Sequence, residues 1–161
     1  MKIKNFFLIV LSITILSILS GCKVQEKKFS SHGITIMLTN QFKEQHDENV
    51  QVFLVTKKYG FMGNAENKAF TGVNNNELEH YTRLVLKNSN KEAEILTFGD
   101  DEEKFCYAYY TAKVGIVSYK YMLVTKEGLA DYYTMNFWSK EANFDKYETQ
   151  FFEWAKTIRV K

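Results

Sequence analysis

Residues 104–138, KFCYAYYTAKVGIVSYKYMLVTKEGLADYYTMNFW, decide the fold of this chain of 161 residues. The stretch holds three strand-like runs, at about 104–113, 116–125 and 131–138, in which alternation of side chains is visible. A half-buried strand shows this period of two, because successive side chains point to opposite faces of the sheet. The connections between the runs are only a few residues long, and short connections join antiparallel neighbours. The stretch therefore predicts an antiparallel meander.

The run at 104–113 indicates what the two faces of this sheet carry. One face has aromatic rings and the other has small side chains: Phe105, Tyr107 and Tyr109 against Cys106, Ala108 and Ala112. Small side chains leave room for a helix to pack closely. No His or Lys is adjacent to Cys106 in the sequence, so we expect a buried thiol with a packing role rather than a reactive one.

Further elements flank this meander. Apolar runs predict strands at 33–38, 50–55 and 92–98. Residues 77–87 place apolar side chains at helical spacing, and Asn76 precedes them as a helix cap. A further helix is thus expected before the meander begins.

The C-terminal segment 143–158 has the clearest helical pattern. Large apolar side chains recur there at steps of three and four: Phe144, Tyr147, Phe151, Trp154 or Ala155, and Ile158. Burial of this stripe predicts a helix that covers the sheet. We therefore expect an α+β domain, an antiparallel sheet of about six strands packed by two helices as an α/β/α sandwich.

Residues 59–75, YGFMGNAENKAFTGVNN, are expected to be the longest irregular stretch of the chain. They contain three of the eight glycines together with several asparagines. Long loops in compact domains are often functional or mobile. Two interpretations stay open for this segment, a binding loop for a ligand or partner and a plain solvent-exposed connection.

The N-terminus is expected to be a targeting signal. Lys2 and Lys4 precede an uncharged apolar run at 6–19, which is shorter than the roughly 20 residues of a membrane span. The run ends in Leu-Ser-Gly-Cys at 19–22, which resembles the lipobox of bacterial lipoproteins. In that class the cysteine carries the lipid, so the resemblance implies lipidation of Cys22. The alternative is an uncleaved anchor helix with an incidental cysteine.

This assignment divides the chain into a signal peptide at 1–21, a lipidated tether at 22–31 and a folded domain at 32–161. It also places the protein on the extracytoplasmic face of a bacterial membrane. Cleavage before Cys22 would remove two of the 21 basic side chains and leave 19 to balance 19 acidic ones. A neutral domain of this kind does not favour nucleic acid as a partner.

No arrangement of residues in the sequence predicts catalysis. The histidines, His32, His46 and His80, lack the spacing of metal ligands, and the acidic run at 100–103 lacks the spacing of a calcium loop. Glycine-rich phosphate loops and nucleophile elbows are absent from the sequence. We therefore expect a protein that is not an enzyme and that holds no metal or cofactor.

Two segments carry a family resemblance. They are FSSHGITIMLTNQF at 29–42 and YYTMNFWSKEANFDKYETQFFEWAKTIRV at 132–160. Together with the order of the predicted elements, they resemble the PsbP-like superfamily of antiparallel α/β/α sandwiches. The resemblance implies the fold and a non-enzymatic, binding-type role, and it transfers no functional residue, because members of the group bind unrelated partners.

These observations lead to two functional hypotheses. The first is a membrane-anchored extracytoplasmic lipoprotein that acts as a binding or accessory module for a protein or cell-envelope partner. The alternative is a small-ligand-binding lipoprotein that uses the 59–75 loop and the aromatic side chains of the sheet. The latter are the tyrosines of adjacent strands, namely Tyr107, Tyr109, Tyr110, Tyr119, Tyr121, Tyr132 and Tyr133.

The first prediction concerns Cys22, the expected site of lipidation. The Cys22→Ala variant should lose metabolic labelling by palmitate and accumulate as an unprocessed precursor, because it lacks the thiol that receives the lipid. Labelling and precursor size are compared with those of the wild-type chain expressed at the same level. Equal incorporation of lipid into the variant would show that Cys22 is not the attachment site.

Overall fold

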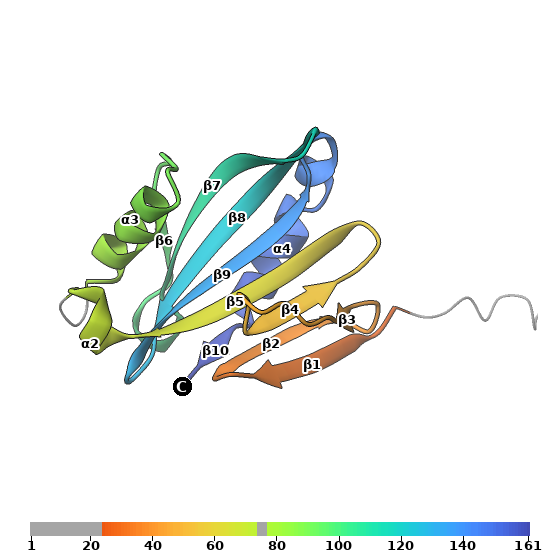
Figure 1. Cartoon of the computed structure of the whole chain (residues 1–161). Coiled ribbons are helices and arrows are strands. Elements are labelled where there is room, and N and C mark those ends of the chain that lie inside the picture. Colours follow the sequence, from red (N-terminus) through yellow and green to blue (C-terminus); the bar gives the residue numbers. More distant parts are fainter. Residues whose placement is uncertain (1–23, 74–76) are drawn as a thin grey trace, which may run out of the picture.

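Two antiparallel sheets make up the fold in the computed structural model, which describes residues 24–73 and 77–161 (Figure 1). The larger sheet has seven strands in the order β3-β4-β5-β9-β8-β7-β6, and the smaller has three in the order β1-β2-β10. The strands of the larger sheet are β3 (Lys43–Glu44), β4 (Val52–Val55), β5 (Tyr59–Asn67), β6 (Leu96–Phe98), β7 (Phe105–Val114), β8 (Val117–Glu127) and β9 (Asp131–Lys140). Those of the smaller sheet are β1 (Glu26–Ser31), β2 (Ile34–Thr39) and β10 (Arg159–Val160).

The helical segments lie between and after these strands. They are α2 (Lys68–Thr71), α3 (Leu78–Asn88), α4 (Glu148–Lys156) and two 3₁₀ segments, η1 (Asp101–Glu103) and η2 (Glu141–Lys146). Within the described residues, no helix has the length and apolar character to cross a bilayer.

One face of the larger sheet packs against α4 and the smaller sheet. Alternate residues of the strands point into this layer, and they are buried together with Phe144 and the apolar side of α4. Phe151 lies at its centre, with ring centroids 5.4 Å from Phe137 and 5.5 Å from Phe144. Trp154 contacts Phe42 at 5.4 Å between centroids and so connects α4 to the segment that follows β2. This layer is the main core of the molecule.

The opposite face of the larger sheet packs against α3. Leu86 of α3 is buried with Ala108 and Leu123, and the ring of Tyr81 stacks on that of Tyr132 with centroids 4.4 Å apart. Cys106 is buried in the same layer, as its place in the alternating strand predicts. The expected sandwich with a helix on each face is therefore confirmed in outline. The strand count differs, because the fold has a seven-stranded sheet and a separate three-stranded one instead of a single sheet of about six.

The expectation of an irregular segment at 59–75 is wrong for its first part. Residues Tyr59–Asn67 form β5, which pairs with β4 on one side and along its whole length with β9 on the other. Two glycines of this strand look like turn residues in the sequence, but the structure needs them because a neighbouring side chain lies where a Cβ atom would be. A Cβ atom at Gly60 would collide with the indole of Trp138, and one at Gly63 would lie 2.7 Å from Cδ1 of Ile34. The segment is therefore a strand that needs close approach of its neighbours.

The expected tether at 22–31 also requires correction over its described part. Residues Glu26–Ser31 form β1, which pairs with β2 from Glu26 opposite Thr39 to Ser31 opposite Ile34. β1 is an edge strand with charged and mostly exposed side chains, a composition that protects an edge from aggregation and also hides the strand signal. The signal peptide at 1–21, the lipidation site Cys22 and the cap Asn76 lie outside the described residues.

Two further elements differ in extent from their predictions. The strand expected at 92–98 is confined to Leu96–Phe98, because Ala93 and Ile95 instead pack beneath α3. The helix expected at 143–158 is divided at Tyr147 into η2 and α4. Its apolar stripe is confirmed, since Phe144, Phe151, Trp154, Ala155 and Ile158 are all buried.

The second prediction tests the packing of α4. Phe151→Ala should lower the free energy of unfolding by about 3–5 kcal/mol, because it removes a fully buried ring and leaves a cavity. Glu153, on the solvent side of the same helix, makes only an exposed pair with Lys156, so Glu153→Ala should stay within about 0.5 kcal/mol. Chemical denaturation of both variants measures the difference. Equally mild effects would contradict the packing described here.

Candidate functional site

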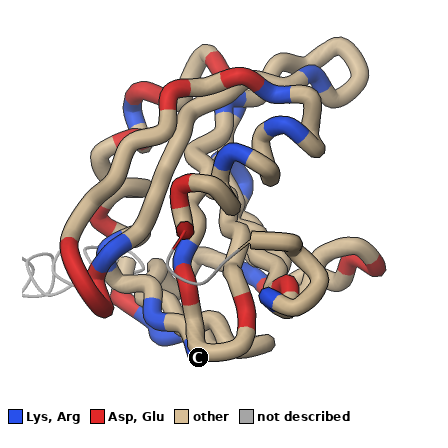
Figure 2. Tube along the Cα trace, turned by 90° about the vertical axis from the view of Figure 1, so that its left-hand side faces the viewer, with Lys and Arg blue, Asp and Glu red and all other residues tan. Residues whose placement is uncertain are grey.

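An open cleft lies at one end of the larger sheet, which we call the distal end. It has a volume of about 1210 Å³ and is formed by α2, the β6–β7 connection, the β8–β9 turn and the last residues of the chain. Figure 2 views the molecule from the side of α2 and α3 and shows basic and acidic segments interspersed there. The cleft brings together nine ionisable side chains from distant parts of the sequence.

The charges that line the cleft are nearly balanced. They are the basic residues Lys68, Lys104, Lys126, Arg159 and Lys161 and the acidic residues Asp100, Asp101, Glu102 and Glu127. A polyanion such as nucleic acid requires a surface of one sign. An alternation of both signs is instead complementary to another protein surface, where charges of each sign find a partner.

Lys126 is the most unusual of these residues, because only 3% of it is exposed. Its Nζ donates a hydrogen bond of 3.0 Å to the backbone oxygen of Glu102 and so connects β8 to the β6–β7 connection. Burial, helped by the nearby positive charge of Arg159 and opposed by Glu103, lowers the pKa of Lys126 from 10.5 to about 8. An amine of lowered pKa is a candidate nucleophile, but Lys126 is almost fully buried and its Nζ donates to the oxygen of Glu102, so the role that the structure shows is to fix the loop.

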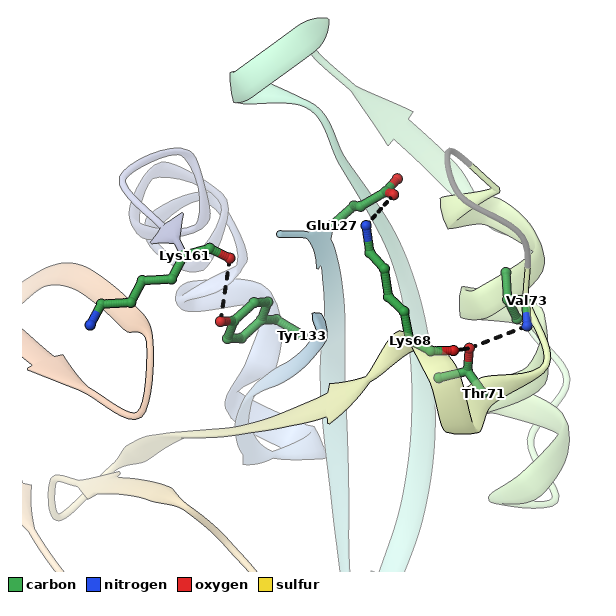
Figure 3. Close-up of polar contacts among 6 residues, drawn as sticks. All are labelled: Lys68, Thr71, Val73, Glu127, Tyr133 and Lys161. Carbon is green, nitrogen blue, oxygen red and sulfur yellow. Dashed lines mark hydrogen bonds and ion pairs between the residues drawn. The ribbon is translucent and has the colours of Figure 1, made fainter. Parts of the chain in front are cut away.

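α2 is tied firmly to the β8–β9 turn beside the cleft (Figure 3). The backbone N–H of Lys68 donates to the oxygen of Ala130 at 3.0 Å, and its Nζ lies 2.6 Å from Oε1 of Glu127. The side chains of this ion pair are only 14% and 20% exposed, so solvent screens it less than a surface pair. Asn67 caps the helix by accepting from the N–H of Ala69. This short helix is therefore held by tertiary contacts.

Two large apolar side chains stand in solvent on this fixed backbone, and we call them the apolar rim. Phe70 of α2 is 86% exposed and Leu129 of the β8–β9 turn is 93% exposed. The turn is held on both sides of Leu129, because the N–H of Gly128 donates to Asp131 and that of Leu129 donates to Lys161. Apolar side chains on a backbone that is already ordered lose little conformational entropy on binding, which favours their use as interface anchors.

The aromatic side chains of the sheet do not form one binding surface. Tyr107 and Tyr109 pack with the α4 layer, while Tyr132 is buried beside α3. On the face that carries α3, Tyr110 and Tyr121 stack at 4.9 Å with only 3° between their planes. One face of each ring is turned toward the other ring, which is the geometry of a stabilising cross-strand pair.

A second pair continues this arrangement across the sheet. Phe53 and Trp138 stack at 5.7 Å with 18° between their planes, and Trp138 lies opposite Tyr121 in the β8–β9 register. The hydroxyl of Tyr110 donates to Oδ1 of Asn136 at 2.9 Å. A flat sugar or base stacks on an open ring face, and each of these pairs already uses one of the two faces of each ring.

The other residues weighed from the sequence lie apart from one another. His32 is in the β1–β2 turn, His46 follows β3, and His80 is on α3, where its Nδ1 lies 3.4 Å from Glu77. The acidic run at 100–103 forms the β6–β7 connection at the cleft. Across residues 24–73 and 77–161, the structure contains no group of three or more His, Cys, Asp or Glu placed to hold a metal ion.

The apolar rim and Lys126 were not identified from the sequence. Lys126 lies in a strand, and its burial depends on the β6–β7 connection and β10, which pack beside it from distant parts of the sequence. Leu129 had a weak signal, because a large apolar residue in the turn Gly128–Leu129–Ala130 is unusual among turn residues. Phe70 had none, since it lies in the segment that was expected to be irregular.

The fold has known counterparts. It is similar to cyanobacterial PsbP (CyanoP) from Synechocystis sp. PCC 6803, with a TM-score of 0.61 and 13% identity over 89% of this chain and 99% of that protein. It is also similar to a crystal structure from Bacteroides thetaiotaomicron VPI-5482, with a TM-score of 0.58 and 16% identity over 85% of this chain. This chain spans about half of the Bacteroides protein, 49% of its length.

At these levels of identity the comparisons show the fold alone, and they confirm the PsbP-like fold expected from the sequence. No protein-family model matches the chain, and no curated protein does. The activity and the partner of this protein therefore have to be argued from its own surface.

The third prediction follows from the buried amine of Lys126. Its folded-state pKa lies below the unfolded value, so between pH 8 and 10.5 the unfolded chain holds more protons and stability rises with pH. Between pH 7 and 9.5 the wild-type chain should gain about 2 kcal/mol in unfolding free energy relative to Lys126→Met. Urea denaturation of both chains across this range measures the gain. Parallel pH profiles would show that Lys126 titrates normally.

Proposed function

We propose that this protein is a membrane-anchored, extracytoplasmic binding module, lipidated at Cys22, whose distal end binds a protein or cell-envelope partner. The observation that carries this proposal is the apolar rim. Phe70 and Leu129 are almost fully exposed on backbone that is fixed by hydrogen bonds, beside a cleft of balanced charge. A pair of apolar anchors next to charged groups of both signs is the composition of a protein interface.

The position of the distal end supports this assignment. The β1–β2 turn, the β8–β9 turn and the end of β10 lie together there, as the hydrogen bonds from Lys161 to Gly33 and from Leu129 to Lys161 require. The described chain begins at the other end, where Glu26 pairs with Thr39. An anchor that precedes β1 would therefore leave the apolar rim directed away from the membrane (Figure 1).

The alternative, a small-ligand-binding lipoprotein, has less support. The described part of the 59–75 segment, which ends at Val73, is almost entirely the strand β5 and the helix α2, so it offers no long loop to enclose a ligand. The cleft is open rather than enclosed, and small ligands are usually held in enclosed, mainly apolar pockets. Balanced charge and exposed rim residues are better matched to a large partner.

The fourth prediction tests the distal end by site-specific photocrosslinking of the full chain in its native membranes. A benzophenone side chain placed at Leu129, or separately at Phe70, should give an adduct of the same size, because both positions contact one partner. The matched control is the same photoprobe at Glu153, which is exposed on α4, and it should give no such adduct. Equal adducts from all three positions would contradict a distal binding site.

A competition experiment makes this test quantitative. The double change Phe70→Ser and Leu129→Ser should lower the yield of the same adduct, captured from a photoprobe at Thr97 in the cleft, about tenfold or more. Both replaced side chains are exposed, so the stability of the variant should stay within about 0.5 kcal/mol of the wild type. An unchanged yield in the folded variant would remove the apolar rim from the proposal.

A further inference from the structure

We propose that the tip of the β7–β8 hairpin is a second membrane contact, which inserts Ile116 into the interface of an anionic bilayer. The inference rests on the proposed membrane location and adds a lipid-binding surface at the end opposite the cleft, which we call the proximal end. It is carried by the shape of the hairpin, by the residue at its tip and by the charges around it.

The hairpin projects beyond the rest of the sheet. β7 and β8 remain paired as far as Val114 opposite Val117, whereas β9 ends at Lys140, opposite Tyr119. On the other edge, β6 pairs with β7 only from Phe105 to Tyr107. The hairpin therefore extends about three residues past β9, roughly 10 Å at the rise of a strand, with no neighbouring strand there.

The tip carries an isoleucine that the turn itself does not require. Gly115 and Ile116 form the two-residue connection, and Gly115 has φ +60°, the conformation for which glycine is favoured at the first position of a type II′ turn. The second position accepts ordinary polar residues, yet it holds Ile116, which is 100% exposed. Val114 beside it is 60% exposed. Ile116 contributes no buried area to the fold and Val114 only a minor part of its surface, so their apolar character points to a contact outside the fold.

Basic and aromatic groups surround the apolar tip. Lys113 of the hairpin and Lys140 at the end of β9 are exposed. Tyr119 is partly exposed and lies in β8, two residues after the last hairpin pair of Val114 and Val117. Two exposed acidic residues of η2 lie at the same end: Glu141 follows Lys140 in the chain, and the carboxylate of Asp145 lies 3.3 Å from Nζ of Lys120. Lysines are attracted to the surface potential of anionic lipids, and tyrosine rings favour the interface between headgroups and acyl chains.

Further lysines extend this basic surface along the same end. The β4–β5 turn presents Lys57 and Lys58, both exposed. This turn lies at the same end as Lys140, because Tyr59, the first residue of β5, pairs with Ser139. The partner is therefore a surface of negative charge with an apolar layer just beneath it, and an anionic bilayer has both.

The described chain also begins at this end. Glu26 lies opposite Thr39 in the β1–β2 register, and Phe42, three residues later, packs on Tyr59 with centroids 5.5 Å apart. Figure 1 shows the start of β1, the β4–β5 turn and the β7–β8 tip along one side of the molecule. A bilayer that holds an anchor preceding β1 is therefore close to the hairpin tip as well.

The tip acts as an orienting contact rather than as an anchor. One isoleucine and a few lysines provide too little affinity to hold a protein at a membrane alone, where even a single acyl chain binds reversibly. Once the anchor supplies a high effective concentration of bilayer, a weak second contact is sufficient to fix the domain's orientation. The distal cleft is then held away from the membrane.

The test uses the full-length chain reconstituted into vesicles of phosphatidylcholine and phosphatidylglycerol. An environment-sensitive fluorophore is attached to Ile116→Cys, and in a matched control to Leu129→Cys at the distal end. Both sites are exposed, Cys106 is buried, and the proposed lipid occupies the thiol of Cys22 in the reconstituted form, so neither native cysteine competes for the label. At position 116 the emission should shift to shorter wavelength and be quenched by spin-labelled lipid, whereas the label at position 129 should report water.

Two further measurements keep the result decisive. The shift should weaken in vesicles of phosphatidylcholine alone. It should also weaken in 1 M salt, where the attraction between charges extends only about 3 Å before it is screened. The double change Lys113→Gln and Lys140→Gln should weaken it in the same way, and a label at Val114→Cys should reproduce the result if the first variant misfolds. An aqueous signal at both ends, or an equal shift at both, would overturn the proposal.

The outcome is separable from that of the proposed function. Palmitate labelling at Cys22 tests the anchor, and photocrosslinking at Leu129 tests the distal binding site, and neither measurement involves residue 116. Insertion of the tip without an adduct at Leu129 would support the lipid contact and reject the distal partner. An adduct without insertion would do the reverse.

Discussion

The aromatic contact between α4 and the larger sheet is the interaction on which the rest of the structure depends. The two sheets share no hydrogen-bonded ladder. They are joined by the rings of Phe151 and Trp154, which pack on Phe137 of the larger sheet and, through Phe42, on the segment that leaves β2. Thr157, directly after α4, accepts the N–H of Met37 at 3.0 Å. Because β10 follows immediately and pairs with β2, the position of α4 also sets the position of the smaller sheet.

This arrangement determines where the two ends of the molecule lie. β10 brings the last residues of the chain to the β8–β9 turn, where the oxygen of Lys161 accepts from Leu129 and from the hydroxyl of Tyr133, the latter at 3.5 Å. The cleft is thus built from chain segments that are far apart in the sequence and that meet only after the core has formed. At the other end, β1 starts opposite Thr39, three residues before Phe42, which packs on Tyr59 and Trp154. The packed body of the domain therefore separates two surfaces of different chemistry.

The sequence predicts the elements whose side chains follow a regular period. It does not predict the elements and the cleft whose structure depends on contacts between distant parts of the chain. The long strands β7, β8 and β9 and the stripe of α4 are visible because each buries one face, so its side chains alternate or recur regularly. β5 was missed because Gly60 and Gly63 resemble turn residues, although their lack of a Cβ makes room for Trp138 and Ile34. β1 was missed because an exposed edge strand has no buried face to read. The cleft was invisible for a further reason, since no local pattern encodes that Lys126 and Arg159 meet.

The contrast between the two ends is best explained by what each one faces. Exposed apolar side chains weaken the solubility of a domain, and they persist where a contact uses them. Here the most exposed ones lie at opposite ends, Ile116 among lysines and the pair Phe70 and Leu129 beside mixed charges. An apolar tip among exposed lysines matches an anionic lipid bilayer, whereas balanced charges around rigid anchors match a protein. If both ends served one kind of partner, their charges would have no reason to differ. The difference itself therefore supports a domain that is oriented on a membrane with its binding end directed outward.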